Sequence, residues 1–240
     1  DAGSMIMTLI KGIFVLLLAV PLSLLALFSI PVERSGRLYH WSAYAWSKII
    51  LRIFRINVMV RGLEHLEGKE RVIYVANHAS WFDIPAMIVG IPDQIRIVFK
   101  KELTVVPIWG WALKWGPYIE IDRSNAKDAL KSLDKAAAQI RKGASVLLFA
   151  EGTRTKDGKL QPFKRGAFAL AVRSGVPVIP VAINNSFRIL PKGSLRVQPA
   201  DIELVLDQPI ETQGIGGKDA ERTLMEKVHQ SIEKNFVEPA

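Results

Sequence analysis

A histidine and an aspartate five residues apart are the side chains of this chain best suited to proton transfer. His78 and Asp83 belong to the run Asn-His-Ala-Ser-Trp-Phe-Asp, 77–83, which follows the apolar, β-branched segment Arg71–Ala76. That segment is typical of a buried strand, and α/β sheets present their chemistry just beyond such strands. Positions five apart on one helix face different directions, so we expect His78 on a loop and Asp83 in the first turn of a following helix, folded to meet the ring.

An aspartate bonded to one imidazole nitrogen fixes the tautomer and raises the basicity of the other nitrogen. The pair would then act as a general base toward a hydroxyl group. The alternative is that both residues serve only stability, as a loop histidine and a helix N-terminal aspartate. Ser80 as a nucleophile is a weaker option, because it lies two residues from its base and no Gly-x-Ser-x-Gly elbow occurs in the chain.

Cations and a glycine turn follow the next predicted strands. Lys100 and Arg123 each end an apolar run and could converge on a phosphate. After Leu147–Ala150, Gly152 permits a sharp turn, while Thr153 offers a hydroxyl and Arg154 a planar fork. Taken singly, these residues are equally compatible with a solvated surface.

The ordered motifs resemble those of the glycerolipid acyltransferase family, which includes bacterial 1-acyl-sn-glycerol-3-phosphate acyltransferases. His78 and Asp83 match its H-x4-D motif. Lys-Lys-Glu-Leu at 100–103 with Ile-Asp-Arg at 121–123 resembles its second block, and Glu-Gly-Thr-Arg at 151–154 matches its third. Val-Pro-Val-Ile-Pro at 176–180 resembles its apolar fourth block, whereas Ala150 stands where many relatives carry proline.

The resemblance implies transfer of an acyl group from acyl-CoA or acyl carrier protein to the free sn-2 hydroxyl of lysophosphatidic acid, without a covalent intermediate. His78 would be the base and Asp83 its orienter. The implied substrate-binding residues, with Glu151 holding Arg154 or the glycerol hydroxyls, are Lys100, Arg123, Glu151, Gly152, Thr153 and Arg154. Alternatives are glycerol 3-phosphate or another lysophospholipid as acceptor, or a non-catalytic membrane lipid-binding module. No P-loop, dinucleotide glycine fingerprint or His-Glu-x-x-His motif occurs, so we expect no cofactor or metal.

Composition points to an anionic partner. The 240 residues carry a net charge of +9 and no cysteine, which excludes disulfides and a thiolate nucleophile. Nucleic acid is not expected, because the cations are not interleaved with aromatic residues in a recognition motif.

The N-terminal region predicts attachment to a membrane. We regard residues 1–4 as a tag remnant, 5–57 as a two-helix anchor and 58–240 as the catalytic domain. Gly12–Ile30 carries no charge and spans about 28 Å as a helix, close to a bilayer core, although Pro21 should kink or break it. In Leu38–Ile56 the aromatic residues, followed by Lys48, Arg52 and Arg55 along one face, favour an interfacial helix, the alternative being a helix packed on the domain.

Two arrangements of this anchor remain open: a hairpin in one leaflet, which Pro21 favours, or a single span followed by the interfacial helix. More basic residues follow the apolar run than precede it, which in the single-span arrangement predicts that the domain lies on the cytoplasmic face of the inner membrane.

Beyond Arg61 strands and helices alternate, so the fold class is α/β, with a mixed, largely parallel central sheet flanked by helices. The predicted strands are Arg71–Ala76, Gln94–Phe99, Tyr118–Ile121, Ser145–Ala150, Val178–Ile183 and Ile202–Leu206. The predicted helices are Ala126–Arg141, with Ser124 or Asn125 as its cap, Gly166–Arg173 and Asp219–Phe236.

Overall fold

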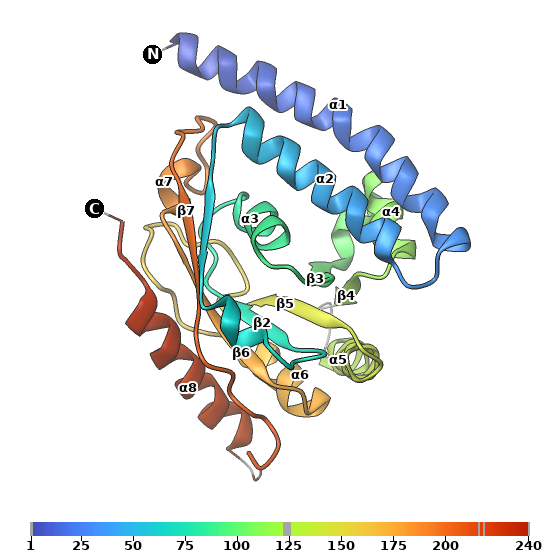
Figure 1. Cartoon of the computed structure of the whole chain (residues 1–240), viewed down its shortest axis with the longest axis vertical. Helices are drawn as coiled ribbons and strands as arrows, with labels where there is room; N and C mark the ends of the chain where they lie inside the picture. Colours follow the sequence, from blue (N-terminus) through green and yellow to red (C-terminus); the bar gives the residue numbers. More distant parts are fainter. Residues whose placement is uncertain (1, 122–125, 216, 218, 240) are drawn as a thin grey trace.

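A seven-stranded sheet forms the centre of the structure (Figure 1), a computed structural model that describes residues 2–121, 126–215, 217 and 219–239. The strand order is β1-β7-β6-β2-β5-β3-β4, and every neighbouring pair is parallel except β6 and β7. The predicted mixed, largely parallel sheet is therefore confirmed. The strands are β1 Val58–Arg61, β2 Ile73–Ala76, β3 Ile95–Lys100, β4 Ile119–Ile121, β5 Ser145–Phe149, β6 Val178–Asn184 and β7 Ile202–Leu206.

All six predicted strands are present, with ends displaced by two residues at most. The unpredicted strand is β1, which lies at the sheet edge beside β7 and is only half-buried. The helices are α1 Ala2–Val32, α2 Arg37–Ile53, α3 Asp83–Gly90, α4 Trp109–Trp115, α5 Ala126–Arg141, α6 Arg165–Ser174, α7 Ser186–Ile189 and α8 Ala220–Asn235, with short 3-10 turns at Leu63–Leu66 and Lys101–Val105. The proposed caps of α5, Ser124 and Asn125, lie outside the described residues.

Helices cover both faces of the sheet because its central strands are apolar on both sides. Along β2, Tyr74 and Ala76 point into a core shared with α2 and α3, whereas Ile73 and Val75 point into a second core built with α5, α6 and α8. Figure 1 shows these helix groups on opposite sides of the sheet. The strand ends, where polar residues follow β2, β3 and β5, are thus held between two packed layers.

The first helix is continuous and largely exposed. Its Met5–Val32 segment is long and apolar enough to cross a membrane. Pro21 neither ends nor interrupts α1, contrary to the predicted break. A single proline removes one backbone hydrogen bond, and the turns on either side stay helical where α1 packs along α2 and α4.

The second helix packs on the domain more closely than the sequence suggests. Ile50 and Leu51 enter the core shared with α3. Tyr39, one of the aromatic residues that favoured an interfacial helix, is 4% exposed and donates its hydroxyl to the Ala112 carbonyl oxygen at 2.9 Å. Trp46 likewise lines an internal cavity, while Trp41 faces outward. The presence of several aromatic residues favoured one membrane-facing surface. Their positions around the helix, however, divide them between the surface and the interior. The division into anchor 5–57 and domain 58–240 stays a prediction.

We predict that Gly62→Ala, at the end of β1, lowers the free energy of unfolding by about 2 kcal/mol or more. Gly62 has φ of +85°, and an added Cβ would lie 2.1 Å from the Leu206 carbonyl oxygen. Gly68 is the matched control, since it also has positive φ but open space around it. Gly68→Ala should cost only about 1 kcal/mol. Equal losses in denaturant titrations of the two variants would contradict the predicted contact with β7.

Candidate active site

The predicted histidine–aspartate pair is present at the end of β2. Asp83 is the first residue of α3, and its Oδ2 lies 2.7 Å from His78 Nδ1. Asp83 is fully buried, whereas the His78 side chain is 15% exposed. The chain thus folds back between the two residues, as their spacing required.

The partners of the His78 ring define its chemistry. A carboxylate can only accept, so Nδ1 carries the proton and Nε2 keeps the lone pair. The ring stacks on Phe149, with centroids 3.9 Å apart, and lines an internal cavity. This stacking holds the imidazole plane, and the sequence motifs gave no indication of it. The arrangement can accept a proton from a group in the cavity.

Asp83 also organises the loop backbone. Its Oδ2 accepts N–H groups from Ala79 at 2.7 Å and Ser80 at 2.9 Å. These two amides are therefore occupied and are not free to stabilise an oxyanion. Asn77 holds the other end of the loop, because its side chain bonds both the N–H and the carbonyl of Ile183 in β6.

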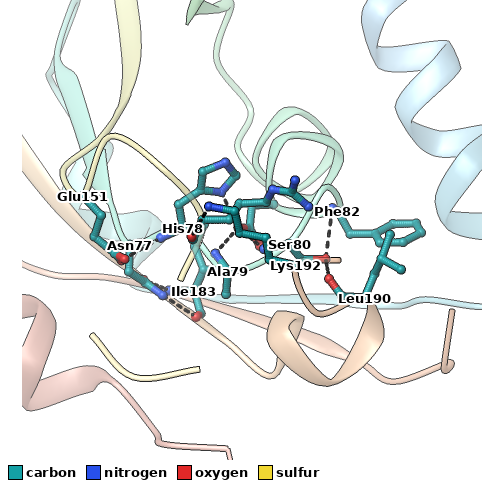
Figure 2. Close-up of polar contacts among 11 residues, drawn as sticks. Asn77, His78, Ala79, Ser80, Phe82, Glu151, Ile183, Leu190 and Lys192 are labelled. Atoms are coloured by element: carbon teal, nitrogen blue, oxygen red, sulfur yellow. Dashed lines mark hydrogen bonds and ion pairs between the residues drawn. The ribbon is translucent and has the colours of Figure 1, made fainter. Parts of the chain in front are cut away.

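Ser80 is bonded into the protein rather than presented to the cavity. Its hydroxyl donates to the Leu190 carbonyl oxygen at 3.3 Å and accepts the Phe82 N–H at 3.4 Å (Figure 2). Ser80 is fully buried, and the cavity lining within the described chain includes His78 but not Ser80. These contacts suit a structural serine better than a nucleophile.

The Glu-Gly-Thr-Arg turn follows β5, beside the His78 loop. Gly152 has φ of +69°, the left-handed conformation expected of a glycine turn. Glu151 contacts a backbone amide rather than Arg154, and its contact with substrate stays a prediction. Glu151 is 2% exposed, and its Oε1 accepts the His78 backbone N–H at 3.0 Å. Figure 2 shows it beside Asn77. Its position behind the loop follows from the pairing of β2 with β5, which local sequence does not reveal.

Burial raises the pKa of Glu151 to about 7, and the nearby charge of Asp83 acts in the same direction. The carboxyl group therefore keeps its proton to a higher pH than an exposed glutamate does. It supports the His78 backbone from inside the protein.

The cavity joins the polar turns to the helices of the N-terminal region. It has a volume of about 750 Å³, is open to solvent on one side, and is lined mainly by apolar residues from α1, α2, α3, α4 and the sheet. Its polar lining includes His78, Lys100, Thr153, Arg154 and Lys164. An apolar chain and an anionic group could thus occupy one continuous space.

The predicted cations are placed as follows. Lys100 is the last residue of β3, and Arg154 lies with its guanidinium carbon 4.4 Å from the centroid of the Trp81 ring. Both residues line the cavity. Arg123 lies outside the described residues. Trp81 lies between His78 and Asp83 in the H-x4-D segment. Its contact with Arg154 depends on the approach of two turns and was not predicted.

Metal binding has no geometric support in the part of the chain that is described. Within it, no group of three or more histidine, aspartate and glutamate side chains is arranged to hold an ion.

We predict that Glu151→Gln changes how stability depends on pH. The folded state holds this proton up to pH about 7, whereas the unfolded state releases it near pH 4.5. The wild-type free energy of unfolding should therefore fall, relative to the variant, by about 3 kcal/mol between these values and stay level above pH 7. Denaturant titrations across pH measure the difference, and parallel curves for the two proteins would contradict it.

Comparison with known proteins agrees with this geometry. A family model described as Acyltransferase matches residues 57–184, more than half of the chain. The crystal structure of the 1-acyl-sn-glycerophosphate (LPA) acyltransferase PlsC from Thermotoga maritima superposes with a TM-score of 0.81 at 25% identity. The match covers 98% of this chain and 96% of that one, so the likeness includes the N-terminal helices.

Relatives in sequence carry similar names. A 1-acyl-sn-glycerol-3-phosphate acyltransferase from Pseudomonas aeruginosa is 35% identical over 197 residues, covering 80% of this chain and 76% of the relative. A chloroplastic 1-acyl-sn-glycerol-3-phosphate acyltransferase from Brassica napus is 32% identical over 176 residues, 72% of this chain. The match spans about half the length of that plant relative. With the family model and the bacterial relative both matched over most of the folded domain, this chain belongs to the acyltransferase family.

Proposed function

We propose that this protein transfers an acyl group from acyl-CoA or acyl carrier protein to the sn-2 hydroxyl of 1-acyl-sn-glycerol 3-phosphate, giving phosphatidic acid. The observation that carries the proposal is the 2.7 Å contact between His78 Nδ1 and buried Asp83, at a cavity that is apolar along most of its lining. The names of the bacterial and plant relatives support the choice of acceptor.

In the proposed reaction His78 Nε2 removes the proton from the acceptor hydroxyl as its oxygen attacks the thioester carbonyl. The new C–O ester bond forms, the C–S bond breaks, and the leaving sulfur takes the proton from the imidazolium. Asp83 stabilises that imidazolium without accepting its proton. No group on the protein is acylated, and the reaction as written needs no cofactor or metal.

The cations of the cavity supply a reason for preferring a phosphorylated acceptor. Lys100 and Arg154 line the same space as His78, so a phosphate bound by them would bring the neighbouring hydroxyl toward Nε2. The direct role of Arg123 in this site stays a prediction. The apolar remainder of the cavity suits the acyl chain of the donor or acceptor.

We also propose that the protein sits on the cytoplasmic face of the inner membrane, with α1 inserted in one leaflet. Because α1 runs alongside α2 and α4, a perpendicular span would draw the domain into the bilayer. Its apolar side chains face outward along most of its length, including Leu16, Leu17, Phe28 and Val32. Arg52 in the last turn of α2 and Arg55 just after the helix are exposed and could contact anionic headgroups.

The test of this proposal is thiol release from acyl-CoA that depends strictly on added lysophosphatidic acid. We predict that His78→Ala lowers turnover by about 10²–10⁴-fold, because the reaction loses its general base. The variant should remain folded, since the imidazole ring is not part of either hydrophobic core. His229→Ala on α8 is the matched control and should retain activity. Wild-type activity in His78→Ala would contradict the assignment.

An acceptor panel separates the remaining possibilities. Preference for glycerol 3-phosphate or another lysophospholipid would show that this compound, and not lysophosphatidic acid, is the acceptor. Liposome binding without any acyl transfer to the panel, from either donor, would indicate a lipid-binding module instead.

We predict that Ser80→Ala retains turnover within a few-fold of the wild type. The direct reaction does not use this hydroxyl, whose loss removes the two hydrogen bonds to Leu190 and Phe82, each worth about 1 kcal/mol of stability. The assay is the same thiol release, combined with a denaturant titration. A loss of activity as large as that of His78→Ala, with the fold preserved, would instead support an acyl-enzyme route.

A further inference from the structure

A short segment after α7 connects the two polar turns of the site. Leu190 offers its carbonyl oxygen to the Ser80 hydroxyl at 3.3 Å, on the loop that carries His78. Two residues later, Lys192 Nζ donates to Thr153 Oγ1 at 3.0 Å and to the Arg154 carbonyl oxygen at 3.4 Å. Figure 2 shows Leu190 and Lys192 beside the His78 loop. The segment therefore contacts both turns.

The bond between Lys192 and Thr153 has a defined direction. A lysine ammonium has three donors and no acceptor, so the Thr153 oxygen must accept. The hydroxyl proton of Thr153 is then free to be donated elsewhere. Thr153 lines the cavity, together with His78 and Arg154, so an acceptor atom for that proton can come from a ligand there.

Lys192 also restrains Arg154. The backbone carbonyl of Arg154 accepts a bond from Lys192, while its guanidinium group lies over the Trp81 ring. The residue is therefore held at both its main chain and the end of its side chain. Among the described residues that line the cavity, Thr153 and Arg154 are present and Lys192 is not, so the ammonium contacts the turn without lining the cavity.

We propose that Lys192 is a positioning residue for phosphate recognition. It holds the Glu-Gly-Thr-Arg turn and sets the Thr153 hydroxyl as a donor to a phosphate oxygen, beside the guanidinium of Arg154. The inference rests on the proposed function in taking the phosphate of the acceptor as the ligand. Its own content is that Lys192 acts through Thr153.

The test measures binding separately from turnover, in a His78→Ala background. The probes are 1-hexanoyl-sn-glycerol 3-phosphate and its phosphate-free analogue 1-hexanoylglycerol. Lys192→Met and Thr153→Val should each weaken binding of the phosphate probe by about tenfold, the effect of one hydrogen bond to a charged group. Binding of the phosphate-free probe should change less than about twofold, because that ligand makes no such bond.

The double variant identifies the route of the effect. If Lys192 acts through Thr153, the double variant binds the phosphate probe no more weakly than Thr153→Val alone. Lys192→Arg, which keeps a cationic donor, should recover most of the affinity. In the His78-containing enzyme, Lys192→Met should raise KM for the acceptor while kcat falls less.

Lys156→Met is the matched control, since it removes one positive charge from an exposed position on the loop that carries Thr153 and Arg154. This variant should leave the affinities for both probes unchanged. Multiplying losses in the double variant, about hundredfold in all, would mean that Lys192 acts by a route other than Thr153, either through its charge or through Arg154, and would overturn the proposal. So would unchanged affinity in Lys192→Met, or equal losses for both probes. Absence of acyl transfer alongside the expected binding changes would reject only the proposed reaction.

Discussion

The site depends on one buried carboxylate. Asp83 Oδ2 accepts three hydrogen bonds, from His78 Nδ1 and from the backbone amides of Ala79 and Ser80. A buried charge is costly unless it is bonded in this way, so the chain between His78 and Asp83 must fold around the oxygen. The same bonds to Oδ2 therefore determine the loop conformation, the tautomer of His78 and the direction of Nε2. The geometry of the His78 loop and the basicity of the His78 ring therefore both follow from the hydrogen bonds to Asp83 Oδ2.

The sheet supplies the second requirement, which is that the two turns approach each other. β2 and β5 are parallel neighbours with Ala76 opposite Phe149, so the chain leaves both strands at the same edge. The turns then exchange hydrogen bonds: His78 donates its N–H to Glu151, and Thr155 donates its N–H to the His78 carbonyl oxygen at 2.8 Å. Neither turn can shift without disturbing the other.

The N-terminal helices add the third element, which is the apolar part of the cavity. Ala26 of α1 and Tyr39 of α2 pack with Ala112 of α4, and all three line the space that reaches His78. The His78 site at the end of β2 and the apolar walls supplied by α1, α2 and α4 thus form one continuous cavity. This explains why α2 is more buried than an interfacial helix would be: its inner face is part of the cavity wall.

Local sequence determined the elements and the principal chemical groups. Apolar, β-branched runs located six strands within two residues, and the five-residue spacing placed His78 on a loop and Asp83 at a helix start, because these features depend on neighbouring residues. The tertiary structure decided the contacts between distant segments: Glu151 beneath the His78 backbone, Arg154 over Trp81, and Lys192 on Thr153.

The tertiary structure likewise decided that β1 forms an edge strand and that Tyr39 points inward. A short apolar segment or an aromatic residue acquires its surroundings from elements far along the chain. The sequence by itself thus determined which groups are available for chemistry and where the strands that carry them lie. Only the packed sheet and helices decided which of those groups meet, because a hydrogen bond between segments tens of residues apart depends on how strands pair and helices dock.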